Sequence, residues 1–239
     1  MRNIVSVENL KKSYDSKIVV DNLCFNIKKG EIFGLLGHNG AGKSTAIDCI
    51  LGLKNFETGT IRILDMEPKK LRKKLFERIG VQLQASSYQD KIKVYELCEE
   101  ISVLYKAVED YKSLLKEFSL EKVKNNYVST LSGGEKQKLA ILLALIPKPE
   151  VVFLDEVTTG LDTEARREVW MQLNKLKKQG VTLLLTSHYM DEVEELCDKI
   201  CIIKNGKEVI SGTVKEVISS SPHTKLEEAY LWYMEKEAM

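Results

Sequence analysis

Residues 37–44 read Gly-His-Asn-Gly-Ala-Gly-Lys-Ser, the phosphate-loop pattern of Gly, four residues, Gly, Lys and then Ser or Thr. Glycines at this spacing let the backbone curl until several N–H groups point into one concavity, where triphosphate oxygens can sit. Lys43 would reach the β- and γ-phosphates, and the Ser44 hydroxyl could hold Mg²⁺. An apolar run at 31–36 precedes the motif, and residues 45–51 can begin a helix. We therefore expect a bound nucleoside triphosphate, against the alternative of a glycine-rich turn before a helix.

The composition excludes several classes of protein. The chain has 239 residues, 44% apolar and 30% charged, enough for one large or two small domains. Its 36 Lys and Arg nearly match its 35 Asp and Glu, so the net charge of +1 gives no sequence-level case for a nucleic-acid partner. The longest apolar run, 139–146, is far shorter than the roughly 18 residues of a membrane span. We expect no secretion signal, and the five cysteines favour buried, reduced thiols.

Three apolar runs are typical of buried parallel strands, and each is followed at once by polar residues. The runs are residues 31–36, 151–154 and 181–185. The phosphate loop follows the first run, Asp155 and Glu156 follow the second, and Thr186, Ser187 and His188 follow the third. Because ligands of open α/β sheets collect at the carboxyl ends of strands, we expect these three sets to converge on one site.

The remaining patterns predict an α/β fold: a phosphate-loop NTPase core with a mostly parallel sheet, an N-terminal antiparallel β layer and an inserted helical subdomain. Residues 1–30 and 59–64 read as short alternating strands. Two helical faces predict a mostly helical block over about 85–150; they comprise Val94, Leu97, Cys98, Ile101, Leu104 and Tyr105, then Val108, Tyr111, Leu114, Leu115 and Phe118. Further helices are expected over 163–178, stopping at Gly180, and over about 225–237. We interpret residues 1–239 as a single domain.

The adjacent acids Asp155 and Glu156 need not share a role, since neighbouring strand residues point to opposite sides. A phosphate-loop protein needs one acid to support Mg²⁺, usually through water, and Asp155 is placed for it. A second acid beside the γ-phosphate can orient or deprotonate an attacking water, and Glu156 is our candidate. The alternative for this pair is a solvated acidic turn.

The signature segment, residues 131–135, reads Leu-Ser-Gly-Gly-Glu and opens a helix whose body is 136–145. A serine hydroxyl and the free N–H groups of two glycines stand where the helix dipole also favours an anion. Taken alone, the segment would be an ordinary helix cap. A chain that already holds one phosphate cradle has a use for a second when two copies face each other. The segment therefore predicts nucleotide shared between protomers.

Taken in order, these motifs resemble the nucleotide-binding subunit of an ATP-binding cassette (ABC) transporter, over essentially all 239 residues. The resemblance rests on the phosphate loop, a glutamine loop at Gln84, the signature segment, the strand ending in Asp155-Glu156, a D-loop at 160–162, and His188. It implies two cofactors, ATP and Mg²⁺. It also implies ATP hydrolysis coupled to transport, with each nucleotide clasped between two cassettes.

The resemblance also implies residue roles. Catalytic roles fall on Lys43, Gln84, Glu156 and His188, and metal-binding roles on Ser44, Gln84 and Asp155. Tyr14 would stack on adenine, although a plain strand tyrosine is the alternative, and Gln82 is a rival to Gln84. Nucleotide-contacting roles fall on Tyr14, Gly37, His38, Asn39, Gly40, Ala41, Gly42, Lys43, Ser44, Thr45, Ser132, Gly133, Gly134, Glu135 and Asp162.

Several segments resemble bacterial multidrug and antibiotic exporter cassettes in particular. The implied partners are a polytopic membrane permease subunit and a second cassette, identical or different, with no nucleic acid. The implied location is cytoplasmic, peripheral on the inner face of the cell membrane. Two alternatives are a soluble ABC-type ATPase acting on a ribosome or nucleic-acid complex, and a phosphate-loop kinase or nucleotide switch. Val157 stands where the family usually has proline, which could loosen the loop running to Asp162 and puts communication across the dimer in doubt.

Overall fold

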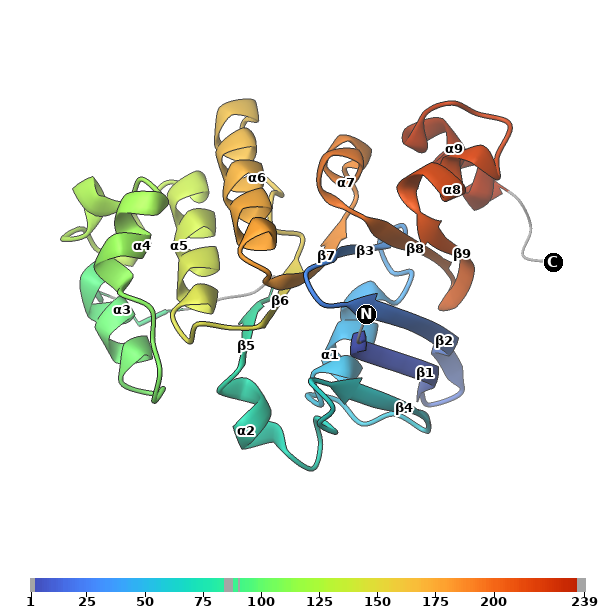
Figure 1. Ribbon diagram of the computed structural model, residues 1–239, viewed down its shortest axis with the longest axis horizontal. Coiled ribbons are helices and arrows are strands. Elements are labelled where there is room, and N and C mark those ends of the chain that lie inside the picture. Colours follow the sequence, from blue (N-terminus) through green and yellow to red (C-terminus); the bar gives the residue numbers. More distant parts are fainter. Residues whose placement is uncertain (1–2, 84–87, 90, 236–239) are drawn as a thin grey trace.

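The computed structural model describes residues 3–83, 88–89 and 91–235 (Figure 1). Near the N-terminus, three strands pair antiparallel in the order β2-β1-β4. They are β1 (Asn3–Tyr14), β2 (Lys17–Lys28) and β4 (Thr58–Ile63). The predicted antiparallel layer is therefore present, but β1 and β2 have 12 residues each and are not the short strands that we expected.

The second sheet has six strands in the order β5-β6-β7-β3-β8-β9. Their bounds are β5 (Ile79–Gln82), β6 (Val151–Asp155), β7 (Thr182–Ser187), β3 (Ile32–Leu36), β8 (Lys199–Lys204) and β9 (Lys207–Thr213). Only β9 runs antiparallel to its neighbour. The three predicted parallel strands, β3, β6 and β7, are buried along their whole length. Burial on both faces explains their nearly continuous apolar sequences.

This six-stranded sheet separates two hydrophobic cores, because successive side chains of each strand point to opposite faces. One core contains α1 (Lys43–Ile50) and the antiparallel sheet, together with Phe33, Leu35, Val151, Phe153 and Leu184. The other core contains α5 (Gly133–Leu145), α6 (Thr163–Lys178) and α7 (Met190–Leu196), together with Ile32, Leu36, Val152, Leu154 and Leu183. The phosphate loop and the signature segment thus open helices on opposite faces of one sheet.

The predicted helical block contains α3 (Val94–Ser102), α4 (Tyr111–Glu117) and α5, with two short 3₁₀ helices, Glu121–Val123 and Val128–Thr130. The helical prediction is wrong at Leu104 and Val108, which lie outside any helix and are 69% and 42% exposed. Both lie between the end of α3 and the start of α4. The apolar period was extrapolated past the point at which the backbone leaves the helix.

The other helices are α2 (Arg72–Phe76), α8 (Val214–Ser219) and α9 (Leu226–Glu235). Helix α6 has the predicted bounds, and Gly180 behind it has a φ of 86°. In Figure 1, α3, α4 and α5 gather at one end of the molecule, and the antiparallel sheet lies toward the other.

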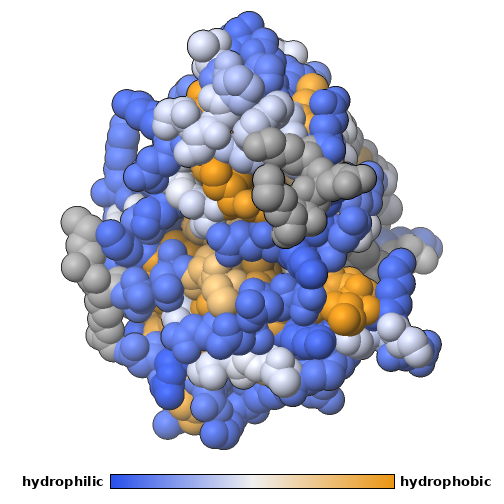
Figure 2. Space-filling view, turned by 90° about the vertical axis from the view of Figure 1, so that its right-hand side faces the viewer, coloured by the Kyte–Doolittle hydropathy of each residue, from blue (hydrophilic) through white to orange (hydrophobic). Residues whose placement is uncertain are grey.

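The end of the molecule shown in Figure 2 is mostly hydrophilic, with hydrophobic residues in small separate areas among those coloured. Within the described ranges, no helix combines the length and apolarity needed to cross a bilayer.

Candidate active site

The phosphate loop joins β3 to α1, and the helix begins at Lys43, inside the motif. Gly42 caps the helix with a φ of 106°, in the left-handed region that side chains disfavour. A Cβ added at Gly42 would lie 2.5 Å from the carbonyl oxygen of Val19 on β2. A hydrogen bond of 3.0 Å from the Gly206 N–H to the Ala41 carbonyl also holds the loop. Glycine is therefore required at 42 both by the backbone angle and by the approach of β2.

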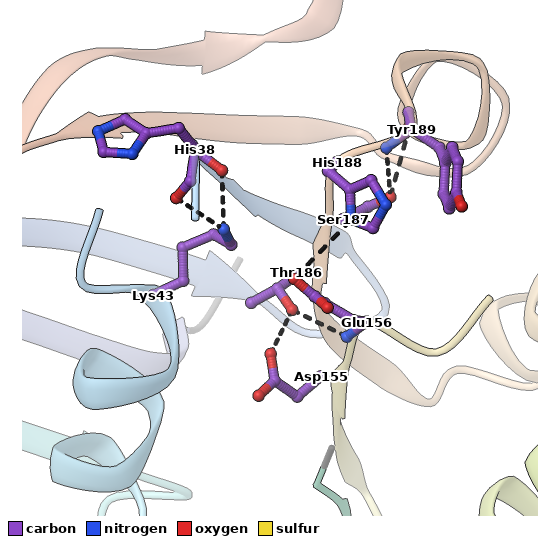
Figure 3. Close-up of polar contacts among 9 residues, drawn as sticks. His38, Lys43, Asp155, Glu156, Thr186, Ser187, His188 and Tyr189 are labelled. Atoms are coloured by element: carbon purple, nitrogen blue, oxygen red, sulfur yellow. Dashed lines mark hydrogen bonds and ion pairs between the residues drawn. The ribbon is translucent and has the colours of Figure 1, made fainter. Parts of the chain in front are cut away.

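Lys43 turns back over this loop (Figure 3). Its Nζ donates hydrogen bonds to the carbonyl oxygens of Gly37, at 2.7 Å, and His38, at 3.2 Å. The side chain is only 5% exposed, and this burial lowers the pKa of Lys43. The nearby carboxylates of Glu156 and Asp155 oppose that shift. The Lys43 ammonium can therefore replace its two carbonyl acceptors with the anionic oxygens of a bound phosphate.

The remaining motif residues differ in exposure. The exposed ones are His38, Asn39, Gly40 and Ser44, whereas Thr45 is half-buried and Gly37 and Ala41 are buried. The open side of the loop is thus formed by its middle and by the first turn of α1.

Asp155 is the last residue of β6 and is 4% exposed. The hydroxyl of Thr186, on the neighbouring strand β7, donates to Asp155 Oδ1 at 2.5 Å. The same hydroxyl accepts a hydrogen bond from the Glu156 N–H at 2.9 Å. Thr186 therefore orients the Asp155 carboxylate and holds the backbone of Glu156, a role that the sequence reasoning missed. Its position at the end of a buried strand, opposite Asp155, was the available signal.

Glu156 has a φ of 52°, so its backbone leaves the strand in a conformation that is uncommon for a residue with a side chain. Its Oε1 lies 3.8 Å from Nδ1 of His188, whose side chain is 40% exposed (Figure 3). The structure thus brings the ends of β3, β6 and β7 together, which confirms the expected convergence of the three polar sets.

The signature segment forms a capping box at the start of α5. The Ser132 hydroxyl accepts from the Glu135 N–H at 3.2 Å, and the Glu135 carboxylate accepts from the Ser132 N–H at 2.8 Å. Ser132 and Gly133 are exposed, Gly134 is half-buried, and a Cβ added at Gly133 would meet nothing within 4 Å. The segment is therefore a helix cap, and it also presents free backbone groups to an open surface.

The loop from Glu156 to α6 is anchored at both ends. Val157 is fully buried in the core that contains α5, α6 and α7. Asp162 caps α6 by accepting from the Ala165 N–H at 2.8 Å. Val157 is thus an apolar anchor for the loop.

Tyr14 lies away from these contacts. Tyr14 ends β1 and is 42% exposed, with the ammonium groups of Lys12 and Lys54 at 4.7 and 5.8 Å from its ring centre. Gln84 lies outside the described residues. Its rival, Gln82, is buried at the end of β5, where its Nε2 donates to the Leu83 carbonyl at 3.1 Å.

The site fits a magnesium ion for which substrate and water supply most of the ligands. Within the described ranges there is no cluster of three or more His, Cys, Asp or Glu that could hold a metal by itself. Ser44 offers an exposed hydroxyl, and Asp155 offers a carboxylate oriented by Thr186. One carboxylate and one hydroxyl beside a phosphate cradle suit Mg²⁺, which is usually bound through one or two carboxylates plus substrate phosphates.

Comparison with known proteins identifies the family. The profile of the family described as "ABC transporter" matches residues 20–159, more than half of the chain. This chain belongs to the ABC transporter family. The ABC relatives of the chain include the Nod factor export ATP-binding protein I of Burkholderia orbicola (strain AU 1054), 37% identical over 90% of this chain and 73% of that protein. The protein of the same name from Sinorhizobium fredii (strain NBRC 101917 / NGR234) is 40% identical over 87% of this chain and 62% of its own length.

Solved ABC structures agree. An ATP-binding subunit of an ABC transporter superposes with a TM-score of 0.88 at 26% identity, covering 96% of this chain and 99% of its own. A dimeric post-hydrolysis state of an ATP-binding cassette bound to ADP and Pi superposes with a TM-score of 0.79 at 25% identity. The match covers 87% of this chain and 98% of that one. The chain is therefore an ATP-binding subunit of an ABC transporter and an ATPase. The alternative of a soluble ATPase acting on a ribosome or nucleic-acid complex is not favoured.

Proposed function

We propose that this subunit closes with a second cassette around two ATP molecules and drives export by a separate polytopic membrane permease. The relatives at 37% and 40% identity are both named for export, which supports export over import. The proposed location is the cytoplasmic face of the membrane, where the permease is reached. We also propose that the chain is one cassette domain, with α3, α4 and α5 as a helical subdomain between β5 and β6.

The observation that carries the shared-site proposal is the placement of two anion-binding loops on opposite faces of one sheet. Lys43 opens α1 in the core with the antiparallel sheet, whereas Ser132 opens α5 in the other core. In Figure 1, β5 and β6 lie between these helices. Ser132 and Gly133 are nevertheless exposed, and the first turn of a 13-residue helix favours an anion. A second cassette would supply that anion as the γ-phosphate of its own ATP.

Each group at the site has a role in this proposal. Lys43 and the loop N–H groups stabilise the charge on the transferring phosphoryl group. Glu156 orients or deprotonates the attacking water, and His188 donates a hydrogen bond to the γ-phosphate. Tyr14 packs on adenine, and Ser44, Asp155 and Gln84 hold the metal. When bound, Mg²⁺ would neutralise charge on the β- and γ-phosphate oxygens.

Mixing two inactive variants tests the shared site. Ser132→Arg should bind ATP yet not turn it over, because the lesion lies in the partner's site. Lys43→Ala should fail to bind ATP. A dimer of one chain of each kind contains one intact site, made from Lys43 of the first variant and Ser132 of the second. We expect ATPase activity to appear on mixing.

Two outcomes would argue against sharing. One is a mixture as inactive as its components although sizing shows mixed dimers. The other is a wild-type specific activity that stays constant on dilution to clearly monomeric concentrations. For the permease, co-purification from membranes followed by identification of the bound polytopic chain tests the partner directly.

A further inference from the structure

Glu192 is a buried acid that the proposed chemistry does not use. Among the described residues, Asp155 and Glu192 are the buried carboxylates, and Glu192 is 1% exposed. Asp155 faces Lys43 and is held by Thr186. Glu192 lies instead in the first turn of α7, four residues after His188. A carboxylate that is removed from water needs polar partners, so its partners indicate what it does.

Three segments converge on the Glu192 carboxylate. From α6, the indole Nε1 of Trp170 donates to Glu192 Oε1 at 3.1 Å. From the end of β7 and from the loop after β6, the hydroxyls of Ser187 and Thr158 also face the carboxylate. The Thr158 hydroxyl is fully buried and makes no well-formed hydrogen bond within the described residues, and the Glu192 carboxylate is the acid beside it.

A positive charge stands beside this cluster. The guanidinium of Arg166, on α6, lies 4.3 Å from the ring centre of Tyr189 and pairs with Asp191 at 3.3 Å. Burial raises the pKa of Glu192, and the two hydroxyls, the indole and the Arg166 charge oppose that shift. The carboxylate thus sits in a polar pocket that favours its accepting hydrogen bonds.

Two of the segments that meet at Glu192, the loop after β6 and the turn after β7, carry residues of the proposed site. Thr158 belongs to the loop that starts at Glu156, since the Thr159 N–H donates to the Glu156 carbonyl at 3.1 Å. Ser187 precedes His188, and its Oγ accepts from the Tyr189 N–H at 3.0 Å, which fixes the turn (Figure 3). Movement of either loop would change the surroundings of the Glu192 carboxylate.

We propose that Glu192 is a positioning residue for ATP hydrolysis: its carboxylate holds the loop that carries Glu156 against the turn that carries His188. This inference rests on the function proposed above and adds a residue to it. Glu192 does not touch the reacting atoms and acts through the two residues that do. Misplacement of a reacting group by about 1 Å can cost about 100-fold in rate, so loss of this link should appear in turnover.

Kinetics of Glu192 variants test this role. We expect Glu192→Ala to lower kcat roughly 10- to 100-fold with the KM for ATP nearly unchanged, because the phosphate loop is intact. Glu192→Gln should recover most of the turnover, since an amide oxygen can accept from the indole and its NH₂ can reach a hydroxyl. Glu195→Ala is the matched control, because Glu195 is exposed on the same helix. If Glu192→Ala is folded and turns over like Glu195→Ala, the proposal is wrong.

Fluorescence gives a second readout, which a purely structural role would not move. Trp170 and Trp232 are the two tryptophans of the chain, so Trp232→Phe leaves the indole bonded to Glu192 as the only one. We expect ATP to shift Trp170 emission in this background, and Glu192→Ala to abolish the shift while ATP still binds. The proposal is wrong if ATP leaves Trp170 emission unchanged when Glu192 is intact. It is also wrong if the ATP-induced shift persists in the Glu192→Ala variant.

Further variants separate the possible failures. If Glu192→Ala does not fold, Trp170→Phe removes one donor to the carboxylate and should lower kcat without raising KM. If Glu156→Gln leaves hydrolysis unchanged, the proposed function fails whatever Glu192 does. If Glu156→Gln is inactive but folded Glu192→Ala and Trp170→Phe keep full turnover, only the inference about Glu192 fails.

Discussion

Nδ1 of His188 lies 3.8 Å from Oε1 of Glu156, and each residue is the first one beyond its strand, β7 for the histidine and β6 for the acid. The pairing of Asp155 with Thr186 sets this relationship, because it brings the two strand ends to within one residue of each other. The positive φ of Glu156 then directs its side chain out of the strand. The position of Glu156, the candidate water-activating residue, therefore depends on the register of β6 and β7.

Replacing Glu156 by glutamine should separate ATP binding from hydrolysis. The amide keeps the size of the side chain but cannot accept a proton, so we expect hydrolysis to fall by about 10²- to 10⁴-fold. ATP binding should survive, because Lys43 and the phosphate loop are unchanged. Steady-state ATPase rates and a nucleotide-binding titration measure the two properties separately. Glu227→Gln, an exposed acid on α9, is the control, and Glu156 loses its role if both variants turn over alike.

Thr186→Val tests the buried hydroxyl that joins the two acids. Valine has nearly the same shape, but the Asp155 carboxylate loses its donor, and the Glu156 N–H keeps only the Thr186 backbone carbonyl, at 3.2 Å, as acceptor. Leaving buried polar groups unpaired costs about 1–3 kcal/mol, so denaturant unfolding should show a loss in that range. We also expect lower turnover. Thr186→Ser keeps the hydroxyl and should restore most of the turnover; equal kcat in the valine and serine variants would show that the hydroxyl does not matter.

The strands that carry the site could be predicted from the sequence, because a strand buried on both faces has a continuous run of apolar residues. Runs such as 151–154 are uninterrupted by polar residues, and the polar residue that ends each run marks the carboxyl edge. The same reasoning failed at Leu104 and Val108, where an apolar period continues although the helix has ended. The spacing of apolar residues indicates which face of a helix is buried, but it does not indicate where the helix ends.

The convergence of the strand ends could be predicted, but individual hydrogen bonds between segments distant in sequence could not. Thr186 and Asp155 are 31 residues apart, and Trp170 and Glu192 are 22 apart, so their hydrogen bonds depend on strand order and helix packing. Glu192 reads as one of several acids on an amphipathic helix, and nothing local marks it as the buried one. The helix cap at Ser132 was predictable from the sequence, whereas the exposed fraction of its side chain follows from the fold.

Two glycines of the phosphate loop should differ in their tolerance of alanine. Both have positive φ, 81° at Gly40 and 106° at Gly42, so each alanine pays a backbone strain of about 1–2 kcal/mol. A Cβ at Gly40 meets nothing within 4 Å, whereas one at Gly42 would lie 2.5 Å from the Val19 carbonyl oxygen. Gly42→Ala should therefore destabilise the nucleotide-free protein clearly more than Gly40→Ala. Equal unfolding midpoints for the two variants would contradict this account of the loop.

Thiol labelling should distinguish Cys24 from the other four cysteines. Cys24 is half-buried on β2, so the prediction that the thiols are buried is wrong there, and the remaining four are buried. Burial raises the pKa of Cys49 to about 11 and that of Cys98 to about 12, and it raises the pKa values of Cys197 and Cys201 well above normal. The thiolate is the reactive form, and a pKa above the solution pH keeps a thiol protonated.

We therefore expect a maleimide at pH 7–8 to label the native protein once, at Cys24, and the unfolded protein at all five cysteines. Raising the pH by one unit should not expose the other four to rapid labelling, because their pKa values still lie above the solution pH and the fold still covers them. Cys24→Ser should remove the fast-reacting group altogether, as mass spectrometry of the intact protein can show. Rapid native labelling that survives this substitution would mean that the strands and helices around the buried thiols open far more readily than their packing indicates.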